Sequence, residues 1–281
     1  MNAHDGLHAL PTMTAMPRTI AFTSGKGGVG KSSLALNTGL ALARRSRRVV
    51  LVDGDLGLAS LTVMLGLAVR WDVRDVIAGR RALRDIVLRG PHGLRIVPAG
   101  SGIAELANLD AGPRGDLLAE LATLGDDADF VLIDTGAGIN ETVCDLVLAS
   151  DEAIVVTRPE PTALADAYAL IKVIVQSHPA YPFHVLVNMV RDEAQGRQVF
   201  DAISEILFRF LQYRPGDAGA VTTDPAVARA VVHQAPFTLV APRCAASRAV
   251  DALATRIAGA ERPGPRLTFW ERLGRVARSR A

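Results

Sequence analysis

The chain has 281 residues, of which 49% are hydrophobic and 5% are aromatic, and its formal net charge is +2 at pH 7. This composition is typical of a folded globular protein and excludes a disordered one, while the near-neutral charge gives no indication of direct nucleic-acid binding. Two widely separated cysteines, Cys144 and Cys244, exclude a disulfide framework and favour a reduced, cytoplasmic compartment.

The N-terminal residues 1–17 have no repeating apolar pattern, and we interpret them as a flexible arm. They contain no Lys or Arg, so they lack the basic start of a secretion signal. No apolar run in the sequence approaches the roughly 18 residues that are needed to span a bilayer. The sequence therefore predicts a cytoplasmic protein that is attached, at most, to a membrane surface.

Six short apolar runs predict the strands of a buried sheet. They lack in–out alternation, which is typical of strands covered on both faces. Amphipathic helical patterns separate several of them, as in residues 161–176 and 191–210. The alternation predicts an α/β fold with a doubly wound, mostly parallel sheet, in one domain over residues 18–259. The predicted strands are Arg18–Ser24, Arg48–Asp53, Leu94–Gly100, Asp129–Asp134, Glu152–Pro159 and Phe183–Val190.

A glycine-rich segment directly after the first predicted strand matches the pattern G-x-x-x-x-G-K-[ST]. Glycines let backbone N–H groups surround phosphate oxygens, Lys31 brings positive charge to the β- and γ-phosphates, and the Ser32 hydroxyl can ligate Mg²⁺. The helix that begins here adds its positive end. The pattern predicts a nucleoside-triphosphate site made of Gly25, Lys26, Gly27, Gly28, Val29, Gly30, Lys31, Ser32 and Ser33.

Three aspartates lie at the ends of predicted strands. Asp53 and Asp55 close the second strand, and Asp134 closes the run from Asp129. Because open α/β sheets bind ligands at the carboxyl ends of their strands, we expect all three to face the phosphate loop. Asp134 is the predicted Walker B carboxylate, which holds Mg²⁺ through water.

Lys26, just after the first glycine in KGGVGKS, resembles the signature lysine of the deviant Walker A motif in the MinD/ParA superfamily of SIMIBI-type P-loop NTPases. The resemblance implies an ATPase that binds ATP or ADP with Mg²⁺ and forms an ATP-dependent homodimer, in which Lys26 reaches the partner's nucleotide. It also implies that Asp55 positions the attacking water, while Lys31 neutralises charge and Asp53 supports the metal. Residues 135–138 are similar to the switch that senses the γ-phosphate, which gives Gly138 a place in the site.

Further stretches resemble the flagellar-number regulators called FlhG, FleN or YlxH, from about residue 18 to 257. They are Asp53–Leu67, Val155–Lys172, Val187–Ile203 and Pro236–Ala254. The resemblance implies a slowly hydrolysing ATP switch that regulates flagellar number or placement. It implies as partners the flagellar GTPase FlhF and/or a flagellar transcription regulator, and it implies that Asn188 contacts adenine.

The sequence also departs from that family. The family's G-x-I-P-x-D pattern near adenine is replaced by Gly219–Asp224 (GAVTTD), and Arg214–Asp217 has the composition of an inserted turn. The arm shares only Asp5, Leu7 and Leu10 with the D-Q-A-x-x-L-R helix that activates FlhF. A division-site ATPase of the MinD type and an antiactivator that acts mainly by binding remain alternative functions.

Residues 260–265 (AERPGP) are a predicted linker, and Arg266–Ala281 form a tail with an amphipathic helical pattern. Phe269, Trp270 and Leu273 fall on one face of this helix, and arginines lie opposite. Such a helix suits the surface of an anionic membrane, and MinD and FlhG proteins use one. The competing interpretation is a helix packed on its own domain or on a partner protein.

Overall fold

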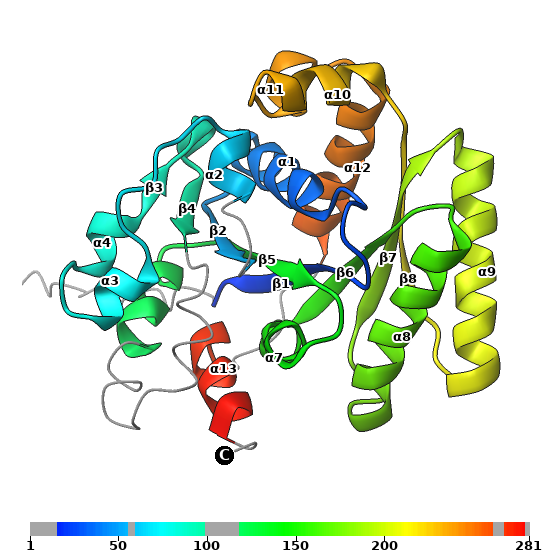
Figure 1. Cartoon of the computed structure of the whole chain (residues 1–281), viewed down its shortest axis with the longest axis horizontal. Coiled ribbons are helices and arrows are strands. Elements are labelled where there is room, and N and C mark those ends of the chain that lie inside the picture. Colours follow the sequence, from blue (N-terminus) through cyan, green and yellow to red (C-terminus); the bar gives the residue numbers. More distant parts are fainter. Residues whose placement is uncertain (1–15, 56–59, 99–117, 261–266, 279–281) are drawn as a thin grey trace, which may run out of the picture.

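The computed structural model describes residues 16–55, 60–98, 118–260 and 267–278, which form an eight-stranded sheet in the order β3-β4-β2-β5-β1-β6-β7-β8 (Figure 1). Every neighbouring pair is parallel except β3 with β4, which is antiparallel. The strands are β1 (Arg18–Ser24), β2 (Val49–Gly54), β3 (Leu88–Arg89), β4 (Arg95–Pro98), β5 (Phe130–Ala137), β6 (Glu152–Thr157), β7 (Phe183–Val190) and β8 (Gly216–Thr222). The predicted doubly wound α/β fold is confirmed.

Helices cover both faces of the sheet (Figure 1). One face carries α1 (Lys31–Arg44) and α12 (Ala245–Gly259), with the short helices α2 (Ser60–Met64), α10 (Pro225–Val232) and α11 (Phe237–Val240) beside them. The other face carries α3 (Val73–Ile77), α4 (Leu83–Ile86), α7 (Glu141–Ala149), α8 (Pro161–Ser177), α9 (Glu193–Leu211) and α13 (Phe269–Arg278). Two 3₁₀ turns lie at Pro91–Gly93 and Thr123–Gly125.

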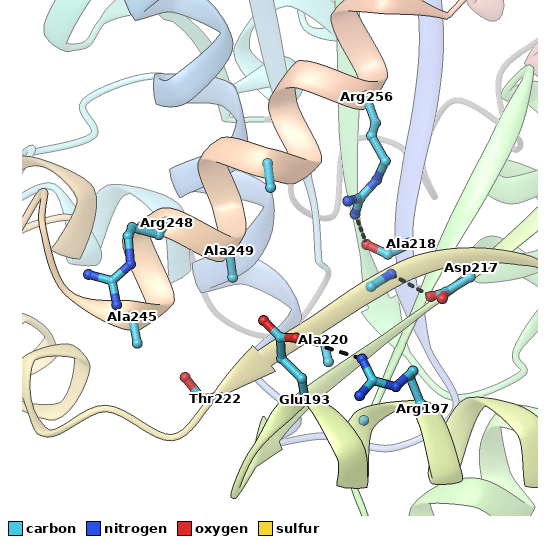
Figure 2. Close-up of a pocket in the computed structure, with 13 residues that line it drawn as sticks. Glu193, Arg197, Asp217, Ala218, Ala220, Thr222, Ala245, Arg248, Ala249 and Arg256 are labelled. Atoms are coloured by element: carbon cyan, nitrogen blue, oxygen red, sulfur yellow. Dashed lines mark hydrogen bonds and ion pairs between the residues drawn. The ribbon is translucent and has the colours of Figure 1, made fainter.

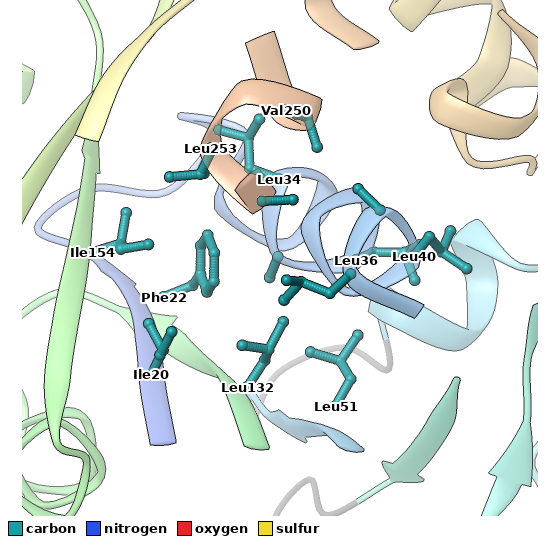
Figure 3. Close-up of a cluster of buried hydrophobic side chains, with 14 of the residues drawn as sticks. Ile20, Phe22, Leu34, Leu36, Leu40, Leu51, Leu132, Ile154, Val250 and Leu253 are labelled. Atoms are coloured by element: carbon teal, nitrogen blue, oxygen red, sulfur yellow. The ribbon is translucent and has the colours of Figure 1, made fainter. Parts of the chain in front are cut away.

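Alternate residues of each central strand supply the cores on the two faces. Ile20 and Phe22 of β1 pack under α1, whereas Ala21 between them faces α7 and α8. Leu34 of α1 joins the same cluster, which Figure 3 shows between the strands and the helices α1 and α12. Because both faces of the sheet are covered, the sequences of these strands are continuous apolar runs.

Strands in the centre of the sheet were predicted accurately, and strands at its edges were missed. β1 and β7 have the predicted bounds, and β5 extends three residues beyond Asp134. The edge strands β3 and β8 have no apolar run of their own. The inserted turn predicted at Arg214–Asp217 is wrong for its second half, because Gly216 and Asp217 begin β8.

Within the described residues, no helix is long and apolar enough to cross a membrane.

Candidate nucleotide site

The phosphate loop connects β1, in the middle of the sheet, to α1. Gly28 and Gly30 have φ values of +77° and +88°, a left-handed conformation that glycine adopts without strain. Gly25 lies against α8, where a Cβ atom would be only 2.1 Å from the backbone oxygen of Asp166. Backbone geometry therefore favours glycine at positions 28 and 30, and close packing on α8 requires it at position 25.

Lys31, the loop lysine, lies inside the site. Its Nζ is 2.6 Å from Asp134 Oδ1 and 3.2 Å from Ser32 Oγ, and its side chain is only 6% exposed. Asp134 lies in β5, the strand next to β1, three residues before that strand ends. The fold thus brings together the predicted lysine, hydroxyl and Walker B carboxylate.

Asp53 lies beside Asp134 because β2 and β5 pair in register at these two residues. Burial and the neighbouring Asp134 raise the pKa of Asp53 to about 7. Burial also raises the pKa of Asp134, although Lys31 and Ser32 oppose the shift. Two adjacent buried carboxylates with raised pKa values form a site in which a bound cation stabilises the ionised form.

The donor set suits Mg²⁺. Asp53 Oδ2 and Asp134 Oδ2 are buried, and neither has a hydrogen-bond partner among the described residues. Among those residues no three His, Cys, Asp or Glu side chains gather closely enough to hold a metal by themselves. The two carboxylates fit Mg²⁺, which in such sites takes one or two carboxylates and completes its shell with phosphate oxygens and water.

Asp55 faces the segment that follows β5's Walker B aspartate. Its Oδ1 is 3.8 Å from the position that a Cβ would take on Gly136. Further along, the N–H of Gly138 donates to Ser24 O at 2.8 Å, and Gly138 has a φ of +98°. A contact between this N–H and a γ-phosphate therefore requires the segment to separate from Ser24.

Lys26 lies outside the buried part of the site, with a side chain that is 41% exposed. Its Nζ is 3.2 Å from Thr162 Oγ1 and 3.6 Å from Glu160 Oε2, at the start of α8. Arg158 also pairs with Glu160, and these two cations lower the pKa of that carboxyl. Glu160 and Thr162 belong to Val155–Lys172, one of the stretches that resemble the flagellar-number regulators, and in the structure this stretch contacts Lys26.

An apolar cavity of about 450 Å³ lies beyond the loop, between the ends of β7 and β8 and the helices α10 and α11. Gly30 and Ser33 connect it to the phosphate loop, and Phe237 and Val231 also line it. Asn188 also lines it and donates its amide hydrogen to Val29 O at 2.8 Å. The size and apolar lining suit a nucleotide base, and of the wall residues named here the sequence identified Gly30, Ser33 and Asn188 but not Phe237 or Val231.

A second cavity of about 430 Å³ lies at the sheet edge between α9 and α12 (Figure 2). It is lined by Arg197, Arg248 and Arg256, and Arg256 donates to Ala218 O at the bulge of β8. It shares Thr222 with the base-side cavity, and none of its lining residues belongs to the phosphate loop. The candidate nucleotide site is therefore the phosphate loop together with the base-side cavity.

The tail helix α13 is packed on its own domain. Phe269, Trp270 and Leu273 are buried in the core that faces α7. Arg272 forms a 3.0 Å ion pair with Asp151. Gly274 permits close packing, since a Cβ there would be 2.5 Å from Leu118 Cδ1. In this arrangement the apolar face that was predicted to meet a membrane is covered by the protein.

Comparison with known proteins places these features in a family. Residues 17–181, more than half of the chain, match the family model described as "AAA domain". The chain is 40% identical to the antiactivator FleN of Pseudomonas aeruginosa over 85% of this chain and 86% of that protein. It is 30% identical to the flagellum site-determining protein YlxH of Helicobacter pylori, over 84% and 80% of the two chains. Among solved structures, the MinC:MinD cell division protein complex of Aquifex aeolicus matches with a TM-score of 0.70 at 28% identity, covering 89% of this chain and 99% of that one.

Proposed function

The chain belongs to the MinD/ParA family of P-loop ATPases, and from this premise we propose that it is an ATP-dependent dimerisation switch that regulates flagellar number or placement. The observation that carries the proposal is the cluster of Lys31, Ser32, Asp134 and Asp53 at the carboxyl ends of neighbouring strands. It offers a cation for the phosphates and oxygens for a metal.

The reaction is hydrolysis of ATP to ADP and phosphate. Water attacks the γ-phosphorus, the bond to the bridging oxygen breaks, and that oxygen stays on ADP. Lys31 neutralises charge on the β- and γ-phosphates, and Asp55 orients the water, because such reactions need positioning and charge neutralisation more than covalent help. Ser32, Asp53 and Asp134 would hold Mg²⁺, which when bound neutralises phosphate charge.

Dimerisation is assigned to Lys26. Its exposed ammonium group lies at the mouth of the site and is held by Glu160 and Thr162 through long contacts of 3.6 and 3.2 Å. Exposed ion pairs of this kind contribute little free energy. Lys26 can therefore exchange Glu160 for the phosphates of a second subunit at small cost.

Membrane association is assigned to α13 after its release from the domain. The helix packs on α7, and α7 begins three residues after the switch segment 135–138 ends. A shift of the switch on binding ATP therefore acts on the surface that covers Phe269 and Trp270. Once released, the apolar face and the arginines of Arg266–Ala281 suit an anionic bilayer.

The kind of protein that this chain would bind is inferred from its relatives. FleN is an antiactivator, and this supports an ATP-dependent complex with a flagellar transcription regulator. FlhF is a second candidate partner, by family resemblance; the arm that would contact it, residues 1–15, lies outside the described residues. The alternative is a MinD-type division-site ATPase, which the likeness to the MinC:MinD complex favours.

Size-exclusion chromatography with MgATP tests the switch. We expect Asp55→Ala to form stable ATP-bound dimers, because it binds ATP and does not orient water. Lys26→Gln should bind ATP and stay monomeric, and Lys172→Gln, on the exposed surface of α8, is the matched control that dimerises. Monomers for the unmodified protein and for Asp55→Ala would reject the switch.

Vesicle sedimentation tests the tail. Removing residues 266–281 should abolish ATP-dependent binding to anionic vesicles. Arg272→Ala removes the ion pair to Asp151, which should release α13, so this variant should bind the vesicles without ATP. Arg275→Ala is the matched control: it removes the same charge from an exposed position and should still require ATP for binding. Equal sedimentation of the full-length and shortened proteins would reject the membrane role.

Counting flagella in a deletion strain separates the two biological roles. An altered flagellar number supports the proposal, and normal flagella with misplaced division septa support the alternative.

A further inference from the structure

Asn37 is a buried asparagine in the middle of α1, 1% exposed, six residues beyond the loop lysine. Asparagine is a poor helix former, and its burial is unfavourable unless its amide is hydrogen-bonded. Here it is well bonded. Its Nδ2 donates to Ser33 O at 2.8 Å, and its Oδ1 accepts from Thr238 N at 2.9 Å and from Thr238 Oγ1 at 2.8 Å.

Two of these bonds join α1 to the segment that carries Phe237, and both segments line the base-side cavity. Ser33 lines the cavity next to the phosphate loop. Thr238, itself 3% exposed, directly follows Phe237, an aromatic residue that also lines the cavity. Asn37 therefore sets the distance between the helix that binds the phosphates and the aromatic side chain against which the base would lie.

The rest of the segment that carries Phe237 is held from other sides. Asp224 accepts from Ala226 N and from Ala245 N, both at 2.9 Å, and so fixes the start of α10 to the start of α12. Ser247 donates from α12 to Ala241 O at 2.8 Å. These bonds orient the segment on α12, and Asn37 supplies its buried hydrogen bonds to α1.

We propose that Asn37 is a positioning residue for base recognition, which acts through Thr238 to hold Phe237 at the separation from α1 that adenine requires. It touches no reacting atom. The inference rests on the proposed ATP site. It assigns the base selectivity of that site to Asn37, a residue that is outside the phosphate loop and does not line the cavity.

Calorimetric titration with MgATP, MgGTP and magnesium tripolyphosphate tests this assignment, since tripolyphosphate has no base. One neutral hydrogen bond corresponds to roughly a two- to tenfold change in affinity. Thr238→Val, which keeps the backbone N–H and loses the hydroxyl, should therefore weaken ATP binding about fivefold. Asn37→Ala, which loses all three bonds, should weaken it about 20-fold. Both variants should lower the preference for ATP over GTP and leave tripolyphosphate binding unchanged. Thr238→Ser, which keeps the hydroxyl, should bind all three ligands with the affinities of the unmodified protein.

Thr38→Val is the matched control. Thr38 neighbours Asn37 on α1 and is fully buried, and its hydroxyl has no hydrogen-bond partner among the described residues. It should bind all three ligands as the unmodified protein does. Unchanged ATP affinity in Thr238→Val and Asn37→Ala would overturn the inference, and so would an equal loss for ATP and tripolyphosphate. If the unmodified protein itself bound no MgATP, the proposed function would fail instead.

Discussion

The two ends of the nucleotide site are built on opposite electrostatic principles. At the phosphate end, burial raises the pKa of both Asp53 and Asp134, so their charged forms need a cation. At the base end, the N–H groups of Ala226 and Ala245 lower the pKa of Asp224, whose charge is already satisfied within the protein. If the proposed nucleotide site is correct, a ligand would complete the phosphate end, whereas the base end is a preformed wall.

The largest expected effect is the removal of the cation at the phosphate end. Lys31→Ala deletes the charge that would meet two phosphate groups, and charge-assisted hydrogen bonds contribute more than neutral ones. We expect MgATP affinity to fall by about 100-fold or more, as measured by calorimetry. Lys172→Ala, which removes an exposed lysine from α8, is the control and should bind normally. Retained affinity in Lys31→Ala would show that the base end dominates binding.

The second prediction concerns pH and applies to the metal-free protein. The pKa of Asp53 is about 7 in the folded state against 3.8 in the unfolded state. Because the folded state binds the Asp53 proton more tightly than the unfolded state does, the protonated group favours folding. This contribution to stability is fully present below pH 4 and is lost as the pH rises from about 4 to 7. Asp53→Asn removes this loss, so it should raise the free energy of unfolding at pH 8 by on the order of 3 kcal/mol and have little effect at pH 4.

Urea denaturation with a chelator at both pH values measures this difference. Asp201→Asn changes an exposed aspartate on α9 and should give no pH-dependent gain. The same Asp53→Asn substitution should weaken Mg²⁺-dependent ATP binding, because it removes a carboxylate. A variant that is less stable than the unmodified protein at pH 8 would contradict the electrostatic difference between the two ends.

The same contrast explains what could be predicted from the sequence. Phosphate chemistry requires particular residue types at fixed spacing, so the loop and the placement of Asp53 and Asp134 at adjacent strand ends followed from the pattern. The base wall needs only apolar side chains, which many residues can supply. The sequence therefore could not distinguish Phe237 or Val231 from ordinary core residues.

Elements at the margins of the sheet were hidden for related reasons. β8 is an edge strand of small residues, GDAGAVT, with a bulge, and it lacks the apolar run that marks a buried strand. The tail was ambiguous because its pattern of Phe269, Trp270 and Leu273 is the same whether the helix lies on a bilayer or on its own domain. Only the three-dimensional packing shows that these residues meet Leu118 and the strands of the adjacent core.

The smallest predicted effect comes from the base wall, where two adjacent valines on α10 provide a matched pair. Val231 lines the base-side cavity and is 51% exposed, whereas Val232 is 79% exposed and is not among the residues that line this cavity. A bound base would remove part of the Val231 side chain from water. Val231→Ser should therefore weaken ATP binding about threefold and leave tripolyphosphate binding unchanged.

Val232→Ser should leave both affinities unchanged, since its side chain stays in solvent in either state. Because both positions are exposed, neither substitution should lower the stability of the protein, and a change in ATP affinity then reports the base contact alone. If Val231→Ser and Val232→Ser bound ATP equally well, the base would lie elsewhere, and the preformed apolar wall would have to serve a different ligand group. If both ligands weakened together in Val231→Ser, the two ends of the site would be coupled more tightly than their separate electrostatics indicate.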